Sequence, residues 1–247
     1  MRAAAPTDFA QLVGFDLSRL PEVENETHGT TVLALRFKEG VVMLADRRAT
    51  MGSLIMYDKA EKIVVLDKAT LVAISGAFAR SVEVCRYLQH AFKFYERRNL
   101  YEISAEGKLM EISKALSGNL SSASTGVGVF LPIAASYDRR AQEFEIYFFD
   151  LAGARFRGAE YACAGSGSER IRGVFDYITR SKGPWSKRSR DDVLVDGLRM
   201  LDIASDLDSA TGGLRKSMPS VSVLTADGVE EIDADAVRPH VEQVLND

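Results

Sequence analysis

A glycine and two threonines, Gly29-Thr30-Thr31, stand directly before an apolar, β-branched run of the chain. Glycine has no Cβ, so a neighbouring hydroxyl can approach its carbonyl with little hindrance. If the Gly29–Thr30 bond breaks, Thr30 gains a free α-amino group beside its own hydroxyl. Such an amine has a pKa of about 7.7–8.0 and can act as a general base near neutral pH. Since an N-terminal threonine is a recognised activated nucleophile, we predict that Thr30 is one.

Two charged residues in apolar surroundings could support this nucleophile. Asp46 ends the run GVVMLAD, and Lys62 begins the run KIVVLD. A lysine turned into an apolar interior needs an anionic partner, and a nearby positive charge favours the ionised form of a hydroxyl. The same spacing also fits an ordinary aspartate–lysine pair at a strand turn. Both interpretations stay open on these two residues alone.

The segments that must position these residues alternate between strand and helix patterns. Strands are predicted where apolar, β-branched runs lie between turn residues, and helices where apolar residues recur every three or four positions. The order of strands, helix pair, strands, helix pair and strands predicts an α+β fold, a four-layer αββα sandwich of two antiparallel sheets flanked by helix pairs. The predicted strands are 30–37, 40–46, 54–58, 62–67, 70–75, 126–138, 143–150, 154–158, 161–165 and 220–225, and the predicted helices are 77–98, about 104–121, about 169–181, 190–207 and a short C-terminal one.

The composition indicates one globular domain with an N-terminal appendage. The chain has 247 residues, of which 46% are hydrophobic and 27% charged, and its net charge of −4 argues against a nucleic-acid surface. No apolar run of about eighteen residues is present, so no membrane span is expected. Cys85 and Cys163 stand far apart in apolar settings, which predicts buried, reduced thiols in the cytoplasm. No group of residues has metal-ligand spacing, and the predicted chemistry needs no cofactor.

Six separated motifs together suggest a family. They are Thr30-Thr31, ADRRAT at 45–50, Lys62, SGA at 75–77, GSGS at 165–168 and DSATGG at 208–213. In order and spacing, over residues 28–230, they resemble a proteasome β-subunit, most closely the bacterial type. The resemblance implies the N-terminal-nucleophile (Ntn) hydrolase fold and threonine endopeptidase activity. It also implies that residues 1–29 are a propeptide removed by self-cleavage between Gly29 and Thr30, which leaves 30–247 as the catalytic domain.

The resemblance further implies a role for each motif. Thr30 would be the nucleophile, and Lys62 would lower the pKa of its hydroxyl while Asp46 orients the lysine. Gly76 would supply an oxyanion-hole N–H at a helix N-terminus. The supporting residues around the Thr30 amine would be Ser166, Asp208 and Thr211. The last of these is often serine in the family, and the GSGS run also fits a plain strand-to-helix turn.

Specificity is expected from the side chains at the positions that line the primary pocket of the family. All six are apolar, so the pocket should accept large apolar or aromatic residues before the cut, a chymotrypsin-like preference. The backbone of Thr50 would pair with the extended substrate as an added strand. The six pocket residues are Ala49, Ala60, Val64, Ile74, Phe78 and Val82.

By resemblance, the expected partners are copies of the same chain in heptameric β-rings, proteasome α-subunits, an ATPase activator ring and unfolded polypeptides. One alternative is the shorter two-ring bacterial protease of the same superfamily, which lacks the late Asp-x-x-Thr-Gly-Gly motif. Another is a catalytically silent ring subunit, which would not keep the Gly-Thr junction together with Asp46 and Lys62. A zymogen that keeps residues 1–29 is a third. His28 could assist the cleavage or be an inert linker residue.

Overall fold

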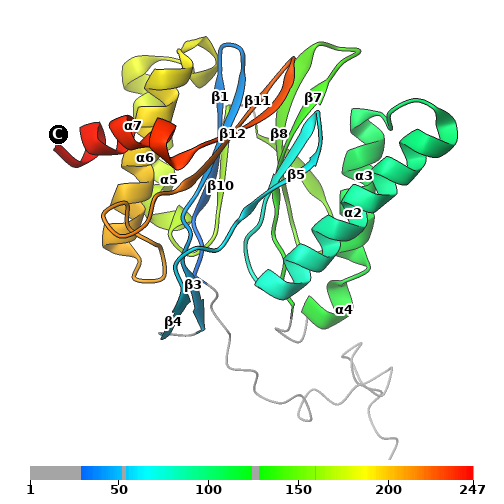
Figure 1. The fold of residues 1–247 in the computed structure, drawn as a ribbon, viewed down its shortest axis with the longest axis horizontal. Coiled ribbons are helices and arrows are strands. Elements are labelled where there is room, and N and C mark those ends of the chain that lie inside the picture. The colour runs from blue at the N-terminus through cyan, green and yellow to red at the C-terminus, as the bar shows by residue number, and fades with distance from the viewer. Residues whose placement is uncertain (1–28, 52–53, 124–127, 159, 247) are drawn as a thin grey trace, which may run out of the picture.

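The computed structural model describes residues 29–51, 54–123, 128–158 and 160–246. Two five-stranded sheets lie face to face, with helices on the outer face of each (Figure 1). The predicted four-layer αββα sandwich is therefore confirmed. None of the described helices is long and apolar enough to cross a membrane.

The first sheet carries the start of the described chain. Its strand order is β10 (Tyr161–Ala164), β1 (Val32–Phe37), β2 (Gly40–Ala45), β11 (Ser220–Thr225) and β12 (Gly228–Ile232). The helices α5 (Ser168–Lys182), α6 (Arg190–Leu207) and α7 (Ala234–Asn246) cover its outer face, together with the 3-10 helix η2 (Trp185–Lys187) (Figure 1). Between this sheet and the helices lies a core with fully buried Phe175 and Trp185.

The second sheet has the order β5 (Ile63–Asp67), β6 (Thr70–Ala73), β7 (Ile133–Asp138), β8 (Glu143–Phe149) and β9 (Arg155–Gly158). The helices α2 (Phe78–Asn99) and α3 (Ala105–Ser117) lie on its outer face, and the short α4 (Leu120–Ala123) follows them (Figure 1). Leu88, Phe92 and Leu109 are buried in the core that these helices form with the sheet.

A third core lies between the two sheets and is built from smaller side chains such as Ala34, Ala73 and Ala135. All residues of β2 are buried, because the strand is covered on both faces. Strands held in this way have little freedom at their ends. The ends of β1 and β2, two buried strands inside the first sheet, therefore place the residues that flank them accurately.

The structure differs from the predicted elements in several places. The strand β12 and the 3-10 helix η2 were not among the predicted elements. A short strand, β3 (Ala49–Met51), was not predicted; it pairs with β4 (Leu54–Tyr57) in a separate hairpin. The helix predicted to reach residue 121 starts as expected, with the Ser104 side chain accepting a hydrogen bond from the Gly107 N–H, but ends at Ser117, before Gly118. The strand predicted from residue 126 begins regularly only at Ile133, after a proline that has no N–H to donate. Residues 124–127 of that prediction lie outside the described residues.

Candidate active site

The ends of three strands bring the predicted catalytic residues together. Thr30 and Thr31 precede β1, Asp46 follows β2, and Lys62 precedes β5. Because β1 and β2 pair antiparallel with Val32 opposite Ala45, Thr31 lies beside Asp46. The Asp46 N–H donates to the Thr31 carbonyl at 3.1 Å, and the Thr31 N–H donates to Asp46 Oδ1 at 2.7 Å.

The Asp46 carboxylate is saturated with donors. Oδ1 accepts from the Thr31 N–H and from Lys62 Nζ at 2.8 Å, and Oδ2 accepts from the Arg48 N–H at 2.9 Å and the Gly212 N–H at 2.8 Å. Asp46 and Lys62 are both almost fully buried. The carboxylate is thus fixed by backbone groups from β1, its own strand end and the loop after α6, and it holds the lysine in turn.

Lys62 has a second acceptor in the backbone. Its Nζ lies 3.3 Å from the carbonyl oxygen of Gly29, the residue before the expected cleavage point. Burial lowers the pKa of Lys62 below the usual 10.5, and the charge of Asp46 opposes this shift only in part. In the chain with Gly29 attached, the ammonium therefore polarises the carbonyl of the Gly29–Thr30 peptide bond.

The Thr30 hydroxyl points at the same carbonyl. Its Oγ1 donates to the Gly29 oxygen at 2.7 Å, and Thr30 is only 5% exposed. The Thr30 nitrogen, which is a peptide N–H in this chain, lies 3.5 Å from Ser166 Oγ. The Thr30 hydroxyl, the Gly29 carbonyl and the Lys62 ammonium therefore occupy one small buried volume.

Three predicted supporting residues form a chain of hydroxyls that ends on a carboxylate. Asp208 Oδ2 accepts from Ser166 Oγ at 2.6 Å and from Thr211 Oγ1 at 2.7 Å. Since the Thr211 proton goes to Asp208, the 2.7 Å contact between the Thr31 and Thr211 hydroxyls requires Thr31 to donate. Burial by itself would raise the pKa of Asp208, but the hydrogen bonds from Ser166, Thr211 and the Ala210 N–H outweigh it and lower the pKa.

Gly76 occupies a position that only glycine fits. Its φ is +101°, and an added Cβ would collide with the Val129 carbonyl. Gly76 forms an isolated antiparallel bridge with Phe130, in which the flanking residues make the hydrogen bonds: Ala77 donates to Val129, and Leu131 donates to Ser75. In such a pair the N–H of the central residue points away from the partner segment. The Gly76 N–H is thus turned outward, just before the start of α2.

The six predicted pocket residues differ in exposure. Phe78 is 38% exposed, whereas Ala60 and Ile74 are buried. Ile74 belongs to the core under α2, and Val64 and Val82 pack against that core while staying partly exposed. Ala49 is also partly exposed. Phe78 is therefore the most accessible of the six side chains.

Two residues of the site were given no role from the sequence. Thr31 is fully buried and joins Asp46 to Thr211. Arg48 is 6% exposed, and its guanidinium donates to the carbonyls of Ser209 and Thr211, at 3.0 and 3.2 Å, and to Asp58. The sequence offered one signal that these two residues belong to the site. Both lie inside motifs already singled out, and Arg48 stands two positions after Asp46.

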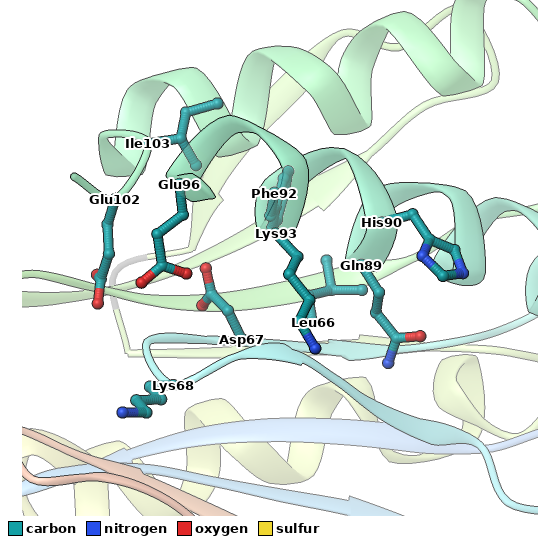
Figure 2. A pocket seen from close by; sticks show the side chains of 10 residues that line it. All are labelled: Leu66, Asp67, Lys68, Gln89, His90, Phe92, Lys93, Glu96, Glu102 and Ile103. Atoms are coloured by element: carbon teal, nitrogen blue, oxygen red, sulfur yellow. The ribbon is translucent and has the colours of Figure 1, made fainter. Parts of the chain in front are cut away.

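Other candidate features lie away from this cluster. A pocket of about 480 Å³ lies between the β5–β6 turn and α2, where Figure 2 shows Glu96 and Glu102 near Asp67, with Gln89 and His90 farther along the helix. None of the predicted site residues lines it. Within the described ranges, no three His, Cys, Asp or Glu residues are placed to hold a metal.

The described histidines and cysteines take no part in the cluster. His28 lies outside the described residues, and His240 lies beside Asp191. Both cysteines are free, as predicted, but only Cys85 is buried; Cys163 is intermediate, which corrects the prediction of two buried thiols. Burial raises the pKa of Cys85 to about 12 and that of Cys163 to about 11, so both thiols are protonated at neutral pH.

Two antiparallel sheets between helix layers, with a threonine at the start of a central strand, define the Ntn-hydrolase class of fold. The sequence model of the family described as "Proteasome subunit" matches residues 26–213. A proteasome subunit beta from Parafrankia sp. (strain EAN1pec) is 33% identical over 250 residues, covering 98% of this chain and 89% of that protein. One from Acidothermus cellulolyticus is 35% identical, covering 91% and 77%. The chain therefore belongs to the proteasome subunit family, as a β-subunit of the bacterial type, and this membership supports a peptidase of the proteasome core.

Proposed function

We propose that this chain is a threonine endopeptidase that activates itself by cutting the Gly29–Thr30 bond. The observation that carries the proposal is the convergence of the Thr30 hydroxyl and the Lys62 ammonium on the Gly29 carbonyl oxygen, at 2.7 and 3.3 Å. A structural lysine–aspartate pair would have no need of a hydroxyl at a cleavable peptide bond. Residues 1–29 are the propeptide, and residues 30–247 are the mature enzyme.

Self-cleavage proceeds in two balanced steps. Thr30 Oγ forms a bond to the Gly29 carbonyl carbon while the Gly29–Thr30 C–N bond breaks, and the hydroxyl proton ends on the Thr30 nitrogen, giving an ester. Water then adds its OH to the Gly29 carbon and a proton to Thr30 Oγ. The products are a Gly29 carboxylate and a Thr30 with free amine and free hydroxyl. Lys62 stabilises the negative charge that develops on the carbonyl oxygen.

Peptide hydrolysis repeats this chemistry on another chain. The free Thr30 amine accepts the hydroxyl proton, directly or through a water, and Oγ attacks the substrate carbonyl. The substrate C–N bond then breaks, the proton passes to the leaving amine, and an acyl-enzyme ester remains. Lys62 favours the ionised hydroxyl, and the outward N–H of Gly76 is the donor for the oxyanion. Water then releases the acyl group. Ser166, Asp208 and Thr211 hold the amine in place.

The pocket positions support a preference for apolar residues before the cut. Ala49, Ala60, Val64, Ile74, Phe78 and Val82 offer no charge to pair with an acidic or basic side chain, which would lose its hydration without compensation. The expected order of turnover is Leu or Phe above Arg and Glu. Comparable turnover of peptides with Glu, Arg and Leu at that position would contradict the proposed chymotrypsin-like preference. It would not contradict the proposed threonine mechanism.

The protein is expected to act in a closed assembly in the cytoplasm. The relatives are named proteasome subunit beta, which supports heptameric β-rings stacked on rings of α-subunits, served by an ATPase ring that delivers unfolded polypeptides. On the described surface, Leu54, Ile55, Met56 and Tyr57 are consecutive exposed apolar residues, as is typical of a surface covered by another subunit. Native mass of the chain, with and without a co-expressed α-subunit, tests the assembly.

The experiment that tests the function is intact mass of the full chain, assembled with its α-partner, followed over time. The wild type should lose residues 1–29 and gain peptidase activity, whereas Thr30→Ala should do neither. Thr225→Ala, which removes a hydroxyl at the far end of β11, is the matched control and should process normally. A wild-type chain that stays intact in assembled particles would instead favour the alternative that this chain is a silent or trapped subunit.

A further inference from the structure

Both the N–H and the carbonyl oxygen of Gly29 make hydrogen bonds to side chains. Its carbonyl oxygen accepts from Thr30 Oγ1 at 2.7 Å and from Lys62 Nζ at 3.3 Å. Its N–H donates to the side chain of Thr50 at 2.8 Å, in a bond that joins residues 21 positions apart. The carbonyl contacts belong to the machinery described above, but the N–H contact has no role in it.

The Thr50 hydroxyl is a buried acceptor in a place built for it. Thr50 is 5% exposed and lies in the middle of β3, next to a break in the regular pairing between β3 and β4. A break of this kind redirects the side chains beside it. The three-residue β3, absent from the predicted elements, is thus the element that brings this hydroxyl to Gly29.

Such an acceptor matters because glycine is the least constrained residue. With no Cβ, Gly29 can rotate about both of its backbone torsions, and each rotation swings the carbonyl away from the Thr30 hydroxyl. A larger residue could not replace Gly29, because a Cβ at position 29 would overlap the side chain and carbonyl of Ala210. The site therefore excludes every side chain at position 29, and the rigidity that a side chain would have given must come from a hydrogen bond.

We propose that the Thr50 hydroxyl is a positioning residue for self-cleavage: it fixes the Gly29 N–H so that the carbonyl stays under Thr30 Oγ and Lys62. This inference rests on the proposed function. The Gly29 N–H, to which the Thr50 hydroxyl is bonded, leaves with residues 1–29. The hydroxyl therefore acts only on the uncut chain. This role is separate from the substrate pairing expected of the Thr50 backbone.

The test compares rates of loss of residues 1–29 in the assembled full chain for Thr50→Val and Thr50→Ser. Valine keeps the shape but removes the acceptor, and one neutral hydrogen bond corresponds to about a threefold to tenfold slower cleavage. Serine keeps the acceptor and should cleave within about twofold of wild type, since the bond itself is retained. Thr50→Ala, which adds no atom, provides the same measurement if valine does not fold.

A matched control is available in Thr70, a buried threonine of β6 whose hydroxyl has no hydrogen-bond partner among the described residues. Thr70→Val should leave the rate unchanged. Wild-type rates in Thr50→Val and Thr50→Ala would overturn the inference and leave the proposed function intact, as would equal slowing in Thr50→Ser and Thr50→Val. Absence of cleavage in the wild type would overturn the proposed function, and this inference with it.

Discussion

The protein contains two buried lysine–aspartate pairs that look alike in isolation. Lys62 lies 2.8 Å from Asp46, and Lys108 lies 2.7 Å from Asp67. Both lysine side chains are at most 3% exposed. Each pair joins separate elements: Lys62 links the start of β5 to the end of β2, and Lys108 links α3 to the end of β5. Burial and pairing alone would therefore assign both pairs the same role.

Their surroundings separate them. Asp46 accepts three backbone N–H groups besides the lysine, whereas Asp67 accepts the Ala69 N–H and remains 25% exposed beside the pocket of Figure 2. Lys62 also donates to the Gly29 carbonyl. A carboxylate saturated by backbone donors holds its lysine in one place, and this lysine contacts the carbonyl of the peptide bond whose cleavage we propose. These two features, more than burial, distinguish the pair that we propose to be catalytic from the other one.

The largest expected effect tests this distinction directly. Lys62→Met should slow self-cleavage at least about 100-fold, because removal of one donor to a developing oxyanion has an effect of that size. Lys108→Met makes the same chemical change in the other pair and should keep the wild-type rate. Intact mass over time measures both. Equal loss of processing in the two variants would mean that the pairs do not differ in function.

Lys108→Met, which should not affect processing, should have its effect on stability. Lys108→Met leaves the Asp67 carboxylate without its cation and should lower the free energy of unfolding by about 1–3 kcal/mol, the usual cost of an unsatisfied, partly buried group. Urea unfolding on a Thr30→Ala background, where no chain can cut itself, gives the value. A cost near zero would show that water from the adjoining pocket already satisfies Asp67, and the pair would then have no structural role either.

The sequence predicted the elements that carry a long periodic pattern. The helix at 190–207 is found with the predicted bounds, and the helix predicted at 77–98 is shifted by one residue. It missed β3, because three residues are too few for a pattern and the strand exists only through its pairing with β4. A strand of this length is defined by tertiary contacts and has no signature of its own.

The site divides in a similar way. Thr30, Asp46 and Lys62 could be named because their residue types imply chemistry and because six motifs agree. The roles of Arg48 and Thr31 could not be predicted, because both residues act through contacts with the loop after α6. This loop is more than 160 residues away from them in the sequence. No local pattern states that Arg48 will bind the carbonyls of that loop. Long-range backbone contacts decide it.

The pH dependence of self-cleavage should also separate the two lysines. Lys62 has a lowered pKa in the folded chain because of burial, so it loses its proton, and with it the polarisation of the Gly29 carbonyl, below the ordinary 10.5. The rate should therefore fall as the pH rises through that lowered value. Lys108→Met should keep this profile. A rate unaffected up to pH 10.5 would argue that the charge of Lys62 is not used.

The same shift predicts a small effect on stability. A lowered pKa means that the folded state binds the proton of Lys62 less tightly than the unfolded state does, so this group destabilises the fold at neutral pH. Its contribution should become more favourable between the lowered pKa and 10.5. In Lys62→Met, on the Thr30→Ala background, the unfolding free energy should lack this rise. Urea unfolding between pH 8 and pH 10 measures the difference.

Asp208 is an intermediate case and gives the smallest expected effect. It accepts from three donors, two hydroxyls and one N–H, whereas Asp46 accepts from four and Asp67 from two. It is much more exposed than Asp46. Because these bonds outweigh burial and lower its pKa, it stabilises the fold above the ordinary pKa of about 3.9, and this contribution is lost as the pH falls through the lowered value. Asp208→Asn should flatten the acid limb of the stability curve slightly. An unchanged acid limb would mean that solvent screens the group, and that saturation by donors matters only where burial accompanies it, as at Asp46.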